Sequence, residues 1–206
     1  RLLNIVQRNI RRMLRLVNQL LDFNKLENDT LKLQVKPIDL ISQLRNLTDI
    51  FRVTANEKGV TFRTYGLEDS LTIWADDDKL DKICFNLLSN AMKFTQAGGK
   101  VEFGLDVISR EEALKFFDLG DKDVDSRYMK VVVKDNGPGI PENQLERIFD
   151  RYYQLENQMR GVYNWGTGIG LYFARTLARM HHGYLKAGNR DEGPGAAFTL
   201  LLPISE

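Results

Sequence analysis

The sequence is poor in the features that mark secreted, membrane-spanning and nucleic-acid-binding proteins. It contains a single cysteine, Cys84, so an internal disulfide is excluded and a reducing compartment is favoured. No run of 18 apolar residues occurs, so no segment is predicted to span a membrane and no membrane contact is expected. The 29 lysines and arginines nearly balance 28 acidic residues, and a net charge of +1 argues against a nucleic-acid partner.

Histidine is scarce as well. His181 and His182 are the only two, and they are adjacent, whereas a metal-binding pair on a helix needs i, i+4 spacing or partners elsewhere. They lie at the end of an expected helix and precede Gly183, so we interpret them as a helix terminus favoured by the dipole.

The first 28 residues carry a different pattern from the rest. Apolar side chains recur every seven residues in two series, which are Leu3, Ile10 and Val17, and Val6, Met13 and Leu20. This heptad pattern is typical of a coiled coil or a helical bundle. One helix cannot bury such a stripe alone, so we expect a partner chain or a missing segment, with packing on its own domain as the alternative. Since the sequence starts inside this helix and without methionine, we interpret it as a piece of a longer protein.

From Thr30 onward, helix and strand patterns are mixed. The expected strands cover residues 30–37, 60–65, 71–75, 98–108, 128–136, 183–189 and 196–203, with 60–65 and 71–75 as a pair. The expected helices cover residues 39–58, 76–95 and 169–180, with short ones near 111–117 and after Pro141. Residues 153–168 lack a period and are predicted to form a long flexible loop. This order predicts an α+β fold, a two-layer sandwich with helices on one face of a mixed sheet, preceded by the coiled-coil-like helix.

The helix expected over 76–95 has an unusual polar face. Its stretch "NLLSNAMKFT" places Asn86, Asn90 and Lys93 at spacings of four and three. At about 100° per residue these side chains share one face beside the apolar stripe. Asparagine is a mediocre helix former because it competes for backbone hydrogen bonds, so its repetition here points to a function. Carboxamide oxygens are hard donors suited to Mg²⁺, and an ammonium group suits phosphate.

Three glycine-rich segments complete the candidate site. "DNGPGI" at 135–140 follows a strand, "GTGIGL" at 166–171 precedes a helix, and "GPGAAF" at 193–198 enters the last strand. The first and third, taken alone, are compatible with ordinary turns. Successive glycines before a helix let backbone N–H groups converge on an anion. A dinucleotide-binding fingerprint fits this segment poorly, because the glycine spacing differs and no strand precedes it.

Together these parts match the needs of ATP bound with magnesium. The helix offers two carboxamides and an ammonium group, and the glycine loop offers backbone donors for phosphate oxygens. Asp135, at a strand end, offers a carboxylate that can accept a hydrogen bond from an exocyclic amine such as that of adenine. Phosphoryl transfer depends mostly on positioning and charge neutralisation, so no nucleophilic triad is demanded.

These residues resemble the motifs of the ATP-binding catalytic domain of sensor histidine kinases, within the wider superfamily of gyrase, heat-shock-chaperone and mismatch-repair ATPases (the Bergerat fold). "NLLSNAMKFT" is similar to the N box, "DNGPGI" to the G1 box, "FDRYYQ" to the F box, "GTGIGL" to the G2 box and "GPGAAFTLLLP" to the G3 segment. Residues 1–29 resemble the second helix of the dimerisation and phosphoacceptor hairpin, and residues 30–206 resemble the catalytic domain.

The resemblance implies cofactors, partners and residue roles. The cofactors would be ATP and Mg²⁺. The partners would be a second copy, contacted through the N-terminal helix, and a response regulator, in the cytoplasmic part of a membrane-anchored sensor. Asn90 would coordinate Mg²⁺ with support from Asn86, Lys93 would contact phosphate, and Asp135 would accept from the adenine amine. The other implied nucleotide-binding positions are Gly137, Gly139, Phe149, Arg151, Gly166, Thr167, Gly168, Gly170, Leu171 and Thr199.

The sequence departs from the family pattern at some positions. Asn86 stands where hydrolysing relatives carry a water-activating glutamate, which favours transfer to a histidine over hydrolysis. Gln154 replaces an arginine whose role Arg151 or Arg160 would take, and Ala196 replaces a serine or threonine.

The acceptor histidine of the family belongs to the first hairpin helix, which this sequence does not contain. ATP binding without self-labelling is therefore expected. The main hypothesis is the ATP-binding catalytic part of a two-component sensor histidine kinase. The alternatives are a degenerate nucleotide-binding or dimerising scaffold and a chaperone- or gyrase-type ATPase.

Overall fold

The computed structural model describes residues 10, 13, 17, 18, 21–28, 30–119, 127–154 and 168–204. The chain divides into two units, Arg1–Leu33 and Gln34–Glu206, and each is described by itself. In the first unit, residues 21–27 are helical, and the carbonyl of Lys25 accepts hydrogen bonds from the N–H groups of Thr30 and Leu31 at 2.9 and 3.2 Å. These two bonds end the helix where the sequence predicts a break.

The apolar stripe of the first unit is exposed where the structure describes it. Ile10, Met13, Val17 and Leu21 are helical, and their exposed fractions are 52, 69, 49 and 52%. Their spacing places them along one side of the helix. The other members of the heptad series, Leu3, Val6 and Leu20, lie outside the described residues.

The second unit begins with a two-stranded antiparallel sheet. Strand β1 (Lys36–Asp39) pairs with β3 (Thr72–Ala75), and Pro37 lies opposite Trp74. The prediction of a strand over 30–37 that stops at Pro37 was therefore wrong in its bounds. Both strands of a two-stranded sheet are edges, so the N–H that proline lacks is not needed for a second partner.

The main sheet has five strands in the order β2-β4-β5-β7-β6. Strand β2 runs parallel to β4, and the other neighbouring pairs are antiparallel, so the sheet is mixed as predicted. The strands are β2 (Thr61–Tyr65), β4 (Lys100–Ser109), β5 (Arg127–Asp135), β6 (Tyr184–Asn189) and β7 (Ala196–Pro203). The expected pairing of 60–65 with 71–75 was wrong. A helix between β3 and β4 carries the chain back across the sheet, so β2 joins β4 in parallel.

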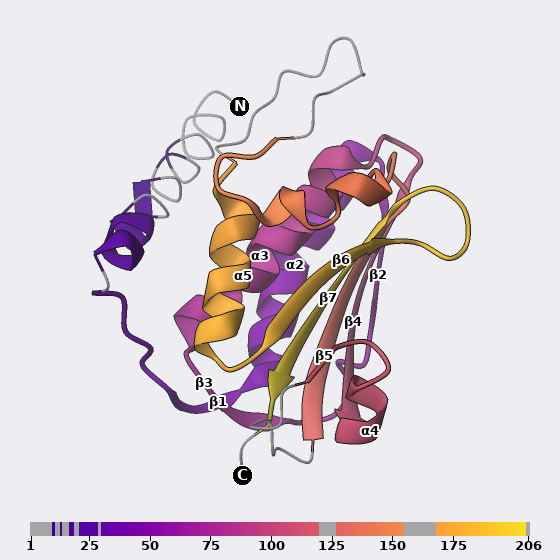
Figure 1. Ribbon diagram of the computed structural model, residues 1–206. Helices are drawn as coiled ribbons and strands as arrows, with labels where there is room; N and C mark the ends of the chain where they lie inside the picture. The colour runs from indigo at the N-terminus through magenta and orange to yellow at the C-terminus, as the bar shows by residue number, and fades with distance from the viewer. Residues whose placement is uncertain are drawn as a thin grey trace. The chain divides into compact units, whose positions relative to one another are not determined.

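Three helices cover one face of this sheet, as Figure 1 shows, and this layering confirms the predicted α+β sandwich. They are α2 (Leu40–Lys58), α3 (Asp77–Phe94) and α5 (Gly170–Met180). The Asp39 side chain caps α2, and Gly59 ends it with a φ of 67°. Cys84 on α3 is fully buried, which confirms that it packs as a small apolar group.

The opposite face of the sheet is partly covered by the connection between β4 and β5. This connection contains a short helix, α4 (Arg110–Ala113), that starts in a capping box made by Ser109 and Glu112. Its apolar side chains form a small core against the sheet, made of Ile108, Ala113, Phe117, Leu119, Tyr128 and Leu201, with Tyr184 packed alongside. The segment, in which a short helix near 111–117 was expected, therefore also contributes apolar packing of its own.

The helix predicted after Pro141 is replaced by two single turns of 3₁₀-helix, η1 (Glu142–Gln144) and η2 (Arg147–Phe149). None of the helices in the described part of the chain combines the length and apolar character needed to cross a membrane.

Candidate functional site

Helix α3 is the element on which the candidate site is built. Its apolar stripe, which includes Ile83, Leu87 and Ala91, is fully buried between the sheet and the neighbouring helices. That burial fixes the rotation of the helix, and with it the direction of the adjacent face that carries Asn86 and Asn90. The predicted polar face is therefore oriented by packing rather than by its own interactions.

The start of α5 lies directly against this polar face. A Cβ added to Gly170, the first residue of α5, would meet the Asn86 side-chain oxygen at 3.1 Å. Asn86 is 93% buried, with an exposed fraction of 7%. Helix N-termini attract anions through their unpaired N–H groups, so this contact places an anion-favouring element beside the carboxamides of α3.

Gly168, just before α5, is held against Tyr152 by a backbone hydrogen bond. The carbonyl of Gly168 accepts a hydrogen bond from the N–H of Tyr152 at 3.0 Å. Gly168 has a φ of 68°, and a Cβ there would meet the Tyr152 backbone at 2.7 Å, so only glycine fits. Residues 155–167, which include the predicted site residues Gly166 and Thr167 and also Arg160, lie outside the described residues.

The end of α3 meets the glycine loop that follows β5. A Cβ on Gly137 would come within 2.9 Å of both the Phe94 carbonyl oxygen and Asp135 Oδ1. Lys93, immediately before Phe94, is half-buried, and its Nζ lies 4.8 Å from the Phe94 ring centroid. Burial lowers the pKa of the Lys93 amine, and a phosphate brought to it would raise that pKa again.

A cation also holds the C-terminal end of α3. Lys58, the last residue of α2, donates from Nζ to the carbonyl of Met92 and, at 3.3 Å, to the carbonyl of Lys93. These carbonyls have no partner within the helix, and they carry the negative end of the helix dipole. Lys58 therefore fixes the turn of α3 that presents Lys93.

Asp135 ends β5 on the same side of the sheet as the helices. It is buried, with an exposed fraction of 3%, and its Oδ1 accepts from the N–H of Gly137 at 2.9 Å and of Ala196 at 3.4 Å. Burial raises the pKa of this carboxyl, while the two N–H groups lower it. Both hydrogen bonds end on Oδ1, so Oδ2 keeps its capacity to accept a hydrogen bond from a ligand.

The aromatic residue before the loop is anchored in the core. Phe149 is fully buried and packs edge-on against Phe198, with ring centroids 6.4 Å apart. The Arg175 guanidinium of α5 lies 4.5 Å from the Phe149 ring centroid and pairs with Glu146 at 3.1 Å. By contrast, Arg151 is exposed, and its guanidinium lies 5.4 Å from the Tyr152 ring.

Most of the described predicted residues gather around α3, but Thr199 does not. Thr199 pairs with Val132 on β5. Asp135 lies on the other face of that strand, together with Val133 and Val131. Because side chains along a strand alternate, Thr199 points away from the face that carries Asp135. Leu171 is half-buried in the first turn of α5, next to Gly170.

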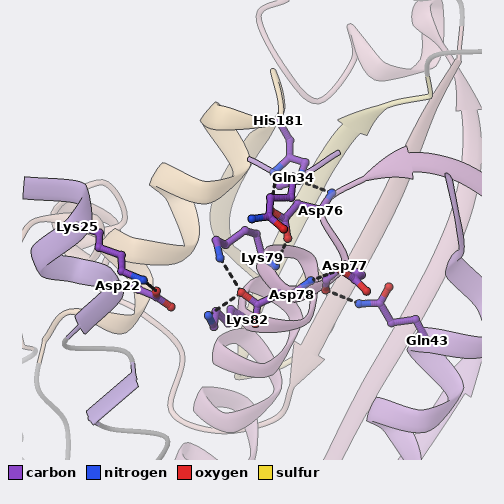
Figure 2. A network of polar contacts seen from close by, with 10 residues as sticks. All are labelled: Asp22, Lys25, Gln34, Gln43, Asp76, Asp77, Asp78, Lys79, Lys82 and His181. Atoms are coloured by element: carbon purple, nitrogen blue, oxygen red, sulfur yellow. Dashed lines mark hydrogen bonds and ion pairs between the residues drawn. The ribbon is translucent and has the colours of Figure 1, made fainter. Parts of the chain in front are cut away.

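Sequence reasoning missed a polar network at the other end of α3, shown in Figure 2. Asp76 caps the helix by accepting from the Lys79 N–H at 3.1 Å, and its second oxygen accepts from the Gln34 N–H at 2.8 Å. The N–H of Asp76 in turn donates to Nε2 of His181 at 3.2 Å, and His181 Nδ1 lies 2.8 Å from the Leu177 carbonyl.

This network joins three segments that are distant in the sequence, namely residue 34, the start of α3 and the end of α5. His181 is buried, with an exposed fraction of 8%, and accepts at Nε2, so it is a neutral imidazole that carries its proton on Nδ1. One signal was readable: His181 follows Ala174, Leu177 and Ala178 at helical spacing, which places it on the buried face of α5.

Comparison with known proteins shows which family the chain resembles. A family model described as "Histidine kinase-, DNA gyrase B-, and HSP90-like ATPase" matches residues 75–206. Hybrid signal transduction histidine kinase D of Dictyostelium discoideum is 34% identical over 203 residues, which is 98% of this chain and 12% of that protein. Sensor histidine kinase WalK of Bacillus subtilis is 32% identical over 206 residues, which is 100% of this chain and 31% of that protein. The chain thus spans less than a third of either relative.

Solved structures agree with the fold. Full-length ShkA in complex with AMPPNP has a TM-score of 0.69 and 28% identity, covering 94% of this chain and 36% of that chain. A nucleotide-free catalytic domain of histidine kinase ThkA has a TM-score of 0.64 and 22% identity, covering 83% of this chain and 96% of that chain. The second likeness concerns the fold alone.

Proposed function

The chain belongs to the histidine kinase-, DNA gyrase B- and HSP90-like ATPase family, and from this premise we propose that it is the ATP-binding catalytic part of a two-component sensor histidine kinase. It would bind ATP with Mg²⁺ and transfer the γ-phosphoryl group to a histidine outside residues 1–206. A response regulator would then receive the phosphoryl group on an aspartate. The histidine kinases among its relatives support this choice within the family.

The observation that carries the proposal is the convergence of two distant glycine segments on α3. Gly170 lies within van der Waals reach of the Asn86 oxygen, and Gly137 lies between the Phe94 carbonyl and Asp135. The helix that carries the two asparagines and the lysine thus lies against two backbone segments in which glycine allows close approach. A nucleoside triphosphate needs two such segments, because its base and its phosphates occupy different parts of the site.

The donor set fits magnesium. Asn86 and Asn90 are one helical turn apart and offer neutral oxygens, and Mg²⁺ commonly takes few protein ligands while keeping waters and substrate phosphates. When bound, the ion would neutralise charge on the phosphates. Asn90 would hold it, Asn86 would support its water shell, and Lys93 would contact a phosphate.

The base and the lid are assigned to the remaining residues. Asp135 Oδ2 would accept from the adenine amine, with Gly137 and Gly139 making room for the ring. Phe149 would anchor the lid in the core, and Arg151 would reach the phosphates. Gly166, Thr167, Gly168, Gly170 and Leu171 would contribute backbone donors. Thr199 is left out of this assignment, because it lies on the opposite face of the sheet.

Asn86 favours transfer over hydrolysis, and His181 is excluded as the acceptor of the phosphoryl group. A carboxamide cannot take a proton from water, so Asn86 is unsuited to the role of a general base. His181 is buried and hydrogen-bonded at both nitrogens, which makes it unsuited as the phosphoryl acceptor. The acceptor would come from another part of the full-length protein or from its dimer partner, which would pair through the apolar stripe of the first unit.

Substitution of Asn90 tests the proposal. Asn90→Ala should abolish the magnesium-dependent part of ATP binding, weakening it about 100-fold when measured by titration calorimetry. The control is Asn56→Ala, which removes an exposed asparagine side chain from α2. The wild-type chain should also phosphorylate a separately supplied hairpin that bears an acceptor histidine, measured as phosphohistidine. Unchanged magnesium-dependent binding in the Asn90 variant would refute the metal assignment, and binding without transfer would indicate a scaffold.

A further inference from the structure

We infer that Asn189, the last residue of β6, is a positioning residue of the proposed nucleotide site. Its carboxamide clamps Ile140 and thereby holds the loop 137–139 in the shape that receives the base. This inference rests on the proposed function and deepens it, because it assigns a role to a residue 49 positions away from the loop that it holds.

The clamp consists of two reciprocal hydrogen bonds. Asn189 Oδ1 accepts from the N–H of Ile140 at 2.8 Å, and Asn189 Nδ2 donates to the carbonyl of Ile140 at 2.7 Å. A carboxamide presents its acceptor and donor side by side, so it can pair with both backbone groups of one residue as a neighbouring strand would. The loop thus gains a substitute strand partner where β5 has already ended.

The first half of the loop has separate anchors. Asp135 Oδ1 accepts from the N–H of Gly137, and Asn136 Oδ1 accepts from the N–H of Lys100 at 2.7 Å. Pro138 and Gly139 follow without such anchors among the described residues, and Ile140 is the next fixed point. Asn189 therefore closes the loop at the end that Asp135 and Asn136 do not reach.

The residues between these anchors make the clamp necessary. Gly139 has a φ of 76°, and a Cβ there would meet Asn189 Oδ1 at 2.9 Å. Glycine loses more conformational freedom than any other residue when a loop becomes ordered. With Ile140 fixed, that ordering is complete before a ligand arrives. Without the clamp, the ligand would have to order the loop, and its affinity would fall accordingly.

The location of Asn189 separates this role from one in general stability. Asn189 is exposed at the end of an edge strand, whereas the side chain of Ile140 is buried and holds its own place in the core. Loss of its two bonds should therefore free the loop locally while the core that holds Ile140 stays folded. The effect of losing the clamp should therefore appear in the affinity for nucleotide and in local exchange.

The test compares Asn189→Ala with the wild-type chain of 206 residues. Affinities for ADP without magnesium and for ATP with magnesium are measured by calorimetry at 15 °C. Both should fall about tenfold, the amount expected for two lost hydrogen bonds, because the loop contacts the base that both ligands share. Hydrogen exchange at the Ile140 amide should become faster by a similar factor.

Arg45→Ala is the matched control. Arg45 also clamps a loop through two bonds to backbone, from Nε to the Leu67 carbonyl at 2.8 Å and from Nη2 to the Glu68 carbonyl at 2.9 Å. It should leave nucleotide affinity unchanged even if it lowers the melting temperature. Asn189→Asp is the second variant, should the alanine variant fail to fold. It keeps the size and the acceptor but removes the donor, and it should also weaken ADP binding, at a salt concentration of about 0.5 M that screens the new charge.

Each outcome is informative. Equal affinity of the wild-type chain and a folded Asn189 variant would overturn the inference and leave the proposed function intact. A wild-type chain that binds neither ADP nor ATP would overturn the proposed function itself, and the inference with it.

Discussion

The two ends of α3 differ in how their polar groups are used. At the start of the helix, both oxygens of Asp76 and its N–H make hydrogen bonds to groups of the protein, including Gln34 and His181 (Figure 2). Farther along, Asn86 in the middle of the helix faces Gly170 at the start of α5, and the Phe94 carbonyl at the other end faces Gly137.

In the proposed assignment, one helix serves stability and binding separately. Side chain to backbone bonds at the start tie the helix to its neighbours, and each such bond contributes about 0.5–1.5 kcal/mol to folding. From Asn86 to Phe94, glycine allows two backbone segments to approach the helix closely, and the proposed nucleotide site is assigned there. Changes at the start should therefore alter stability, and changes at the far end should alter affinity.

Asp135→Asn should have the largest effect, and it should change nucleotide affinity. The substitution would place an –NH₂ group where Oδ2 accepts, so a ligand amine would meet a donor. We expect ATP affinity to fall about 10- to 100-fold, the amount that a hydrogen bond to a charged group provides. The preference should shift toward ITP, whose base presents a carbonyl oxygen at that position. Competition calorimetry measures the ratio, and an unchanged ratio would contradict the assignment of Asp135 to the base.

Asp76→Ala tests the stability side. It removes the cap of α3 and leaves the Gln34 N–H without its acceptor, so the free energy of unfolding should fall by about 2–3 kcal/mol. Urea unfolding followed by circular dichroism measures the change. Nucleotide affinity should be unchanged at temperatures where the variant is folded.

The Asn variant at this position is the control for Asp76→Ala. Asp76→Asn keeps an oxygen for the Lys79 N–H and loses only the second acceptor, so it should cost less than the alanine variant. Equal losses in the two variants would show that the cap contributes nothing here.

Local patterns made α3 and its polar face predictable from the sequence. The apolar stripe around Ile83 and Leu87 has a period that one helix determines by itself, and Asn86, Asn90 and Lys93 are placed by the same period. The glycine segments were also recognisable, because each lies between readable elements. Their convergence on α3 is a tertiary fact, which their chemistry and the resemblance to a family suggested but which no local pattern encodes.

Features that depend on one distant contact were not predictable. Asn189 acts on Ile140 across 49 residues, and His181 acts on Asp76 across 105 residues, and neither contact leaves a period in the sequence. The pairing of β2 with β4 in place of β3 belongs to the same class, because strand pairing is set by non-local packing. The face of the sheet on which Thr199 lies was likewise not predictable, because it depends on register, which the sequence leaves open.

Acid should weaken the start of α3 through His181. Burial lowers the pKa of this imidazole, the Leu177 carbonyl and Asp76 raise it, and His182 and Lys79 lower it further. The unfolded chain therefore binds the proton at a higher pH than the folded chain. Stability is fully present above the unfolded pKa, about 6.5, and is lost as pH falls toward the folded pKa.

The melting temperature should therefore fall between pH 7.5 and 5.5, and His181→Gln should reduce that slope. His182→Gln, at an exposed position, is the control and should retain the slope. Asp135 contributes in the opposite direction, since its folded pKa is raised, so the comparison is made between variants rather than on wild type alone. An identical slope in wild type and His181→Gln would rule out this histidine as the source.

His182→Gly should give the smallest effect, and in the stabilising direction. His182 has a φ of 56°, in the left-handed region that costs an ordinary residue about 1–2 kcal/mol and glycine almost nothing. Glycine also raises the entropy of the unfolded chain, which offsets part of that gain. The net increase in the free energy of unfolding should be about 0.5–1 kcal/mol, or 1–4 °C in melting temperature. His182→Ala separates backbone from side chain, because alanine keeps the left-handed strain and should not stabilise. If both variants raised the melting temperature equally, the gain would come from removal of the imidazole beside His181. The unfavourable effect of His182 at the end of α5 would then be electrostatic. It would also reach the start of α3, because His181 accepts the hydrogen bond from Asp76.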